Sequence, residues 1–161
     1  MKFILISPKN RTVYNFRGEL LKELISQGYE VMVTSPDEID ANKIMELGIR
    51  FIQIPLKKNG LGLLSDIKYI LALIKLFIDE KPDITLGYTI KPVIYGAIAA
   101  KLAGVKNIYS MVTGAGYVFT ANTAKARLIK LIASILYRIG FKCANKVIFQ
   151  NKDADLLRAP V

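Results

Sequence analysis

Residues 110–120 read Ser-Met-Val-Thr-Gly-Ala-Gly-Tyr-Val-Phe-Thr, an apolar strand end that runs into a turn containing two glycines. A long helix that mixes basic and apolar residues is expected to follow over 123–144. A strand, a tight turn and a helix in this order are typical of a crossover unit in a parallel sheet. The stretch therefore favours an α/β fold built from such units.

The same alternation of strand and helix extends over the whole chain. Apolar runs predict six strands, at 2–7, 29–34, 49–54, 83–86, 105–111 and 146–149. Helical spacing predicts helices from Thr12 or Asn15 to Gly28, then over 40–47, 65–80, 92–102 and 123–144, and a last one after Asn151. Thr12 or Asn15 and Ser65 are expected to cap two of them. Because no hairpin signal separates the strands, we predict one domain, 1–161, with a Rossmann-like, doubly wound parallel sheet of about six strands.

Composition excludes several classes of protein. An apolar fraction of 52% with 22% charged residues excludes a disordered chain. The chain has no histidine and one cysteine, which excludes imidazole acid–base chemistry, most zinc sites and a disulfide framework. We expect no metal and no cofactor. No apolar run approaches the roughly 18–20 residues that a membrane-spanning helix requires.

The net charge of +10 comes from one segment. No Asp or Glu occurs between Asp83 and Asp153, and this window holds ten Lys and Arg residues, which leaves 13 basic against 13 acidic residues elsewhere. Such an excess indicates a polyanionic partner: nucleic acid, anionic lipid or a phosphorylated substrate. Lysine and aliphatic residues dominate the segment, so we favour a lipid headgroup surface and expect no nucleic-acid partner.

The predicted helix 123–144 has two different faces at about 100° per residue. Its predicted core face consists of Leu128, Ile129, Ile132, Ile135, Leu136 and Ile139. Its predicted outer face mixes cations with large apolar side chains: Arg127, Lys130, Leu131, Tyr137, Arg138, Phe141 and Lys142. Basic heads among apolar residues suit a membrane interface, and the alternative is a contact with another protein.

Ligands of doubly wound sheets bind beyond the carboxyl ends of the strands, so the loops at 7–15, 87–92 and 112–122 should share one rim. Asn15 and Arg17 could hold an anion or a sugar hydroxyl there, or serve only as a cap and a solvated cation. Lys91, beside Pro92 at a helix start, could hold phosphate or be an ordinary surface lysine. The first loop lacks the Gly-x-Gly-x-x-Gly pattern, which argues against a dehydrogenase.

The glycine turn after the fifth predicted strand has two interpretations. Thr113, Gly114, Gly116 and Tyr117 could let the backbone approach a ligand closely, or could form a tight turn with no ligand. No nucleophile–base pair is visible in the sequence, so the catalytic residues are unknown.

Four segments, in order, resemble those of a known family: Tyr14-Asn15-Phe16-Arg17, Thr-Ile-Lys-Pro-Val-Ile-Tyr-Gly at 89–96, Thr-Gly-Ala-Gly-Tyr-Val-Phe-Thr at 113–120, and Val-Ile-Phe-Gln-Asn-Lys-Asp at 147–153. The chain resembles, over essentially its full length, the N-terminal domain of a bacterial family 4 GT-B glycosyltransferase. Within that family it is similar to the enzymes of capsule, exopolysaccharide or O-antigen synthesis. Two features differ from the family: these 161 residues lack a C-terminal donor-binding domain, and they lack the histidine that many relatives place at the cleft.

The resemblance implies the acceptor-side half of a retaining, metal-independent hexosyl- or N-acetylhexosaminyltransferase. Its parent protein would move a sugar from a nucleotide-sugar donor to a saccharide linked to polyprenyl diphosphate, at the inner face of the cytoplasmic membrane. Acceptor binding would then fall to Asn15, Arg17, Thr89, Lys91, Thr113, Gly114, Gly116 and Tyr117. Two other hypotheses stay open: a non-catalytic membrane adaptor that recruits a separate glycosyltransferase subunit, and a nucleotide- or nucleic-acid-binding Rossmann module.

Overall fold

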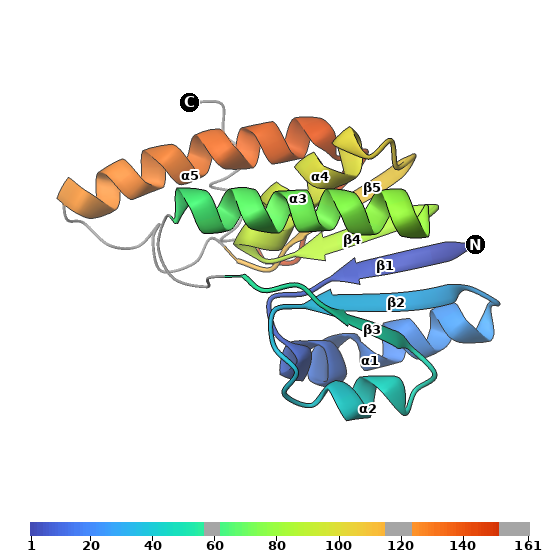
Figure 1. The fold of residues 1–161 in the computed structure, drawn as a ribbon. Helices are drawn as coiled ribbons and strands as arrows, with labels where there is room; N and C mark the ends of the chain where they lie inside the picture. Colours follow the sequence, from blue (N-terminus) through green and yellow to red (C-terminus); the bar gives the residue numbers. More distant parts are fainter. Residues whose placement is uncertain (57–61, 115–123, 152–161) are drawn as a thin grey trace.

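The computed structural model describes residues 1–56, 62–114 and 124–151, with the backbone alone for 124–126 and 128 (Figure 1). One sheet holds the strands β1 (Lys2–Ile6), β2 (Glu30–Ser35), β3 (Arg50–Gln53), β4 (Ile84–Tyr88), β5 (Asn107–Val112) and β6 (Lys146–Phe149). Their order is β3-β2-β1-β4-β5-β6, and all five pairings are parallel. This is the strand order of a Rossmann fold. The predicted fold class is confirmed.

The central strand β1 is buried on both faces of the sheet. Phe3 and Leu5 belong to one hydrophobic cluster, while Ile4 and Ile6 belong to the other. Successive side chains of a strand point to opposite faces, so a strand covered by helices on both sides needs an unbroken apolar run. The run at the start of the sequence is therefore a direct consequence of the two-sided helix cover.

The helices α1 (Asn10–Ser26) and α2 (Ala41–Met45) cover one face of the sheet (Figure 1). The helix α1 starts earlier than predicted, with Lys9 at the N-cap position, so neither Thr12 nor Asn15 is its cap. The buried Asn10 side chain fixes this start. It donates Nδ2–H to the carbonyl of Asp37 at 2.6 Å and accepts the hydroxyl of Ser35 at 2.6 Å.

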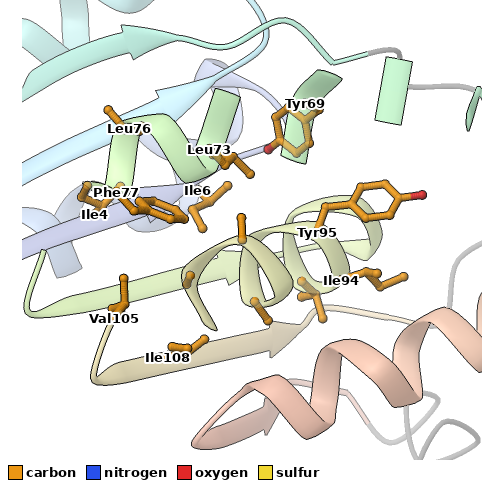
Figure 2. Close-up of a cluster of buried hydrophobic side chains, with 14 of the residues drawn as sticks. Ile4, Ile6, Tyr69, Leu73, Leu76, Phe77, Ile94, Tyr95, Val105 and Ile108 are labelled. Carbon is orange, nitrogen blue, oxygen red and sulfur yellow. The ribbon is translucent and has the colours of Figure 1, made fainter. Parts of the chain in front are cut away.

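The other face carries α3 (Leu63–Glu80), the π-helical turn η1 (Pro92–Gly96), α4 (Ala97–Leu102) and α5 (Ala124–Cys143). Figure 2 shows side chains of α3 meeting residues of the sheet and of η1 in a cluster that includes Ile4, Phe77 and Ile94. The helix α3 already begins at Leu63, so Ser65 lies in its first turn and donates its hydroxyl to the carbonyl of Gly62. The helix predicted after Asn151 lies outside the described residues.

The predicted faces of α5 are partly wrong. Tyr137, placed on the outer face by its sequence pattern, is only 1% exposed, and Phe141 is half-buried and packs beside it with ring centroids 5.3 Å apart. Ile135 and Ile139, placed in the core, are about half exposed, at 48% and 45%. The helix is thus rotated relative to the prediction. Its outer face consists of Arg127, Lys130, Leu131, Ile135, Arg138, Ile139 and Lys142.

The close approach of α5 to η1 explains this rotation. Gly140 is buried, and a Cβ atom built on it would lie 2.9 Å from Cα of Ile94 and 3.3 Å from the carbonyl oxygen of Val93. Backbones come this near only where a side chain is missing. Gly140 therefore faces η1, and Tyr137 and Ala133 of the same helix belong to the hydrophobic cluster on this face of the sheet.

We expect Gly140→Ala to lower the free energy of unfolding by about 1–3 kcal/mol, because the added methyl group overpacks the contact with η1. Gly18→Ala in α1 is the matched control. A Cβ on Gly18 meets nothing within 4 Å, so the gain in helix propensity should stabilise the chain by about 0.5–1 kcal/mol. Urea unfolding followed by circular dichroism measures both changes. A Gly140→Ala variant as stable as the wild type would contradict the tight contact.

Candidate functional site at the carboxyl edge of the sheet

A cluster of hydroxyl groups joins the end of β4 to the loop after β1 and to the first turn of α1. The phenol oxygen of Tyr88 lies 2.6 Å from Oγ of Ser7 and 2.8 Å from Oγ1 of Thr12. Burial of Tyr88 raises the pKa of its phenol, although the bonds to Ser7 and Thr12 and the charge of Arg17 act in the opposite direction. The phenol group of Tyr88 is therefore neutral, and hydrogen bonds with Ser7 and Thr12 hold its oxygen in place.

Arg17, in the second turn of α1, extends across this cluster. Its guanidinium carbon lies 5.1 Å from the centre of the Tyr88 ring, a cation–π distance. Nη1 donates to the carbonyl of Phe16 at 3.0 Å, and Nη2 donates to Oε1 of Gln150 at 3.1 Å. The arginine thus links the first helix to the end of β6. Asn15, its predicted companion, lies exposed on α1.

Thr89 has a strained backbone at the end of β4. Its φ of 67° lies in the left-handed region, which β-branched residues rarely adopt. Two backbone hydrogen bonds hold it there: its N–H donates to the carbonyl of Met111, and its own carbonyl accepts from Val93. Strain of this kind is often found at functional sites, as are π-helical turns such as η1.

Lys91 lies in a buried ion pair. Its Nζ donates to Oδ1 of Asp66 at 2.7 Å, and the side chains of Lys91 and Asp66 are only 14% and 6% exposed. The hydroxyl of Tyr95 donates to the other oxygen of Asp66 at 2.9 Å. Burial, followed by the bond to Asp66 and the charge of Asp66, raises the pKa of Tyr95 well above its usual range.

Asp66 is the residue of this site that the sequence analysis missed. One signal was available: Asp66 lies three residues before Tyr69 and seven before Leu73, on the buried face of α3. A carboxylate on such a face usually has a cationic partner. No signal in the sequence identified Lys91 as that partner. Lys91 also lines a pocket of about 200 Å³ with Pro8, Leu56, Thr89, Ile90 and Pro92.

The glycine turn is described only in part. The carbonyl of Thr113 accepts Nδ2–H of Asn151 at 2.9 Å, which ties the end of β5 to the residue that follows β6. Gly114 has open space where a Cβ would stand. Gly116 and Tyr117 lie outside the described residues. A larger hollow of about 360 Å³ lies at the opposite edge, near Pro82 and Gly104, away from this rim.

Two further findings concern the described part of the chain. It holds no group of three or more His, Cys, Asp or Glu side chains placed to bind a metal ion. Among the helices of residues 1–56, 62–114 and 124–151, none has the length and hydrophobicity needed to cross a membrane.

A Rossmann sheet with a polar, partly cationic rim beyond its strands defines a ligand-binding α/β domain. Comparison of the sequence with known families identifies which one. Residues 3–151 match the family described as Glycosyl transferase 4-like, and the chain belongs to that family. The resemblance to family 4 glycosyltransferases is thereby confirmed.

Two curated relatives are similar to this chain. An N,N'-diacetylbacillosaminyl-diphospho-undecaprenol alpha-1,3-N-acetylgalactosaminyltransferase from Campylobacter jejuni is 26% identical over 98% of the chain and 42% of its own length. A UDP-Gal:alpha-D-GlcNAc-diphosphoundecaprenol alpha-1,3-galactosyltransferase from Escherichia coli is 31% identical over 67% of the chain and 27% of its own length. The chain therefore spans less than half the length of either relative.

Solved structures show the same fold at low identity. Acinetobacter baumannii MurG aligns with a TM-score of 0.65 and 15% identity over 94% of this chain and 42% of its own. A UDP-GlcNAc 2-epimerase from Neisseria meningitidis aligns with a TM-score of 0.62 and 14% identity over 99% of this chain and 44% of its own. Similarity at this level establishes a shared fold and nothing more.

The ion pair gives a prediction about stability. Lys91→Met leaves the Asp66 carboxylate buried without its cation and should lower the free energy of unfolding by about 3 kcal/mol. The matched control is Lys75→Met, which removes the exposed pair with Asp79 and should cost less than about 1 kcal/mol. Adding Asp66→Asn to Lys91→Met should recover part of the loss. Equal urea midpoints for Lys91→Met and Lys75→Met would contradict a structural role for the buried pair.

Proposed function

We propose that this chain is the acceptor-binding half of a glycosyltransferase that moves a sugar from a nucleotide-sugar donor to a lipid-linked saccharide. The transfer would be retaining and independent of metal, and it would belong to the assembly of a surface polysaccharide. The donor would bind to a C-terminal domain outside these 161 residues. Catalysis would then require both halves.

One observation carries this proposal. Both curated relatives are named as transferases whose acceptor is a sugar on diphospho-undecaprenol, and one of them matches 98% of this chain. They differ in the sugar that they transfer, whereas the diphospho-undecaprenol part of the acceptor is common to both. A shared acceptor chemistry with different donors is what a conserved acceptor-side domain would produce.

The geometry of the rim supports the acceptor role. Arg17, Thr89, Lys91 and Thr113 come from three different segments of the chain, and all lie at or just beyond the carboxyl edge of the sheet. Cations suit the diphosphate, and the exposed amide of Asn15 together with the Thr113 hydroxyl suits sugar hydroxyl groups. Thr89, with its strained backbone, and Lys91 both line the small pocket. The contribution of Gly114, Gly116 and Tyr117 to this rim is part of the proposal.

An anionic membrane surface is the second partner in this proposal. The outer face of α5 combines four cations, Arg127, Lys130, Arg138 and Lys142, with Leu131, Ile135 and Ile139. The outer face of α3, on the same side of the sheet, adds exposed aliphatic residues: Leu63, Leu64, Ile67, Leu71 and Ile78. Figure 1 shows both helices in the layer that faces away from α1 and α2. Cations mixed with aliphatic side chains fit lipid headgroups above acyl chains.

Ligand binding tests the acceptor role. A short-chain prenyl-diphosphate-linked N-acetylhexosamine should bind to the 161-residue chain, whereas UDP-sugars should bind far more weakly because their main site would lie in the absent domain. Isothermal calorimetry at constant ionic strength measures both affinities. The free prenyl alcohol is the control for binding through the hydrocarbon alone. Tight binding of UDP-sugars without any binding of the lipid-linked sugar would reject the acceptor-side assignment.

Sedimentation with vesicles tests the membrane surface. Replacing Arg127, Lys130, Arg138 and Lys142 together by Gln should lower binding to phosphatidylglycerol vesicles at least tenfold, because each basic residue contributes about 1 kcal/mol near an anionic membrane. The charge-matched control replaces Lys9, Arg11, Lys22 and Lys43, which are exposed on the α1 and α2 side. Equal sedimentation of the two variants would contradict the membrane role and favour a protein partner.

A further inference from the structure

Arg17 and Lys91, the two cations predicted for this rim, have opposite electrostatic surroundings. Lys91 faces a buried carboxylate at 2.7 Å, so its charge is largely compensated by Asp66. Arg17 contacts only neutral groups among the described residues: the Tyr88 ring, the Phe16 carbonyl and the Gln150 amide. Of these two cations, Arg17 is therefore the one whose charge is not compensated by a carboxylate among the described residues.

The neutral partners also fix the plane of the guanidinium. The guanidinium carbon lies over the Tyr88 ring, whose hydroxyl is held by hydrogen bonds with Ser7 and Thr12. Gln150, which is 133 positions away in sequence, holds Nη2 at the open end. A planar cation held by an aromatic ring and an amide is preorganised. The side chain therefore loses little additional conformational entropy when it binds an anion.

The guanidinium retains unused donors. An arginine has five N–H groups, and two bonds to described residues use only two of them. Its Nε–H is buried and has no hydrogen-bond partner among the described residues. Nε and Nη2 lie along the edge with which arginine grips two oxygens of a phosphate or carboxylate. A buried donor without a partner is uncommon in folded proteins, and here it lies on that edge.

We propose that Arg17 is the residue of this rim that binds the diphosphate of the lipid-linked acceptor, and that Tyr88 and Gln150 are its positioning residues. This inference rests on the proposed function for the identity of the ligand. It replaces Lys91, the phosphate-binding residue expected from the sequence, by a cation whose partners leave its charge available. Lys91 then serves to join α3 to η1 through Asp66.

The first test uses inorganic pyrophosphate at low ionic strength, with binding followed by calorimetry and by the NMR signal of the Arg17 Nε–H group. Arg17→Lys keeps the charge but loses the two-oxygen grip, so affinity should fall about tenfold or more. Arg11→Lys is the control, since Arg11 is exposed on the same helix, and its affinity should stay within about twofold. Unchanged affinity of Arg17→Lys, with both variants folded by circular dichroism, would overturn the proposal.

A second variant separates positioning from stability. Gln150→Glu keeps the length of the side chain and strengthens its bond to Arg17, so the melting temperature should be unchanged or higher. The new carboxylate competes with the anion, so pyrophosphate affinity should fall about tenfold. A residue with a purely structural role would show no such loss. Pyrophosphate binding to Gln150→Glu at wild-type affinity would reject the assignment of the anion to this edge of Arg17.

Competition distinguishes the two sources of a diphosphate. Farnesyl diphosphate should displace pyrophosphate from the wild-type chain, and UDP should not. Displacement by UDP alone would overturn the assignment to the acceptor. The lipid-linked sugar then separates this inference from the proposed function: equal binding to wild type and Arg17→Lys would reject the role of Arg17 while the acceptor-side function stands. Failure of that sugar to bind the wild type would reject both the function and the acceptor assignment.

Discussion

The rest of the structure depends on the position of the η1 turn, which is fixed by two glycines. A Cβ on Gly87 would lie 2.5 Å from the carbonyl oxygen of Pro92, and a Cβ on Gly140 would lie 2.9 Å from Cα of Ile94. The turn is therefore packed backbone to backbone between the end of β4 and the C-terminal part of α5. Only glycine permits both contacts. The strained Thr89 and the buried Lys91 follow, because the chain must pass from β4 into this confined turn.

The same constraint decides which side of α5 faces the core. Hydrophobicity alone would place the isoleucines inside and Tyr137 outside, but a helix that must touch another backbone turns its small residues toward it. Gly140 therefore faces η1, and Ile135 and Ile139 remain on the surface. The sequence pattern favoured the wrong face because a helical wheel ranks side chains by polarity and ignores size. The resulting outer face has more aliphatic surface among its cations than the sequence indicated.

Features that depend on neighbouring residues in the sequence could be predicted from it, whereas features that depend on contacts between distant residues could not. The six strands and the parallel topology were predictable because unbroken apolar runs and the absence of hairpin signals are local properties of the sequence. The start of α1 was not, because the side chain of Asn10 is held by Ser35 at the end of the next strand and by Asp37 in the loop after it. The partners of the rim cations were equally hidden. Asp66 lies 25 positions from Lys91, and Gln150 lies 133 positions from Arg17, so only the fold brings them together.

The two rim cations show how neighbours decide what a positive charge does. A carboxylate 2.7 Å from a lysine stabilises the charge inside the protein, and it also cancels most of the field that a ligand would experience. The Tyr88 ring and the amide oxygen of Gln150 contact Arg17 without carrying a net charge of their own. The positive charge of Arg17 is therefore not cancelled by these partners. A chain with ten basic residues and no acid between Asp83 and Asp153 could have placed many cations at its cleft. In the folded chain, Asp66, which precedes that window in the sequence, forms an ion pair with Lys91 and compensates its charge. In the proposed diphosphate site, the ligand would therefore meet the charge of Arg17, whose partners among the described residues are neutral, and not that of the paired Lys91.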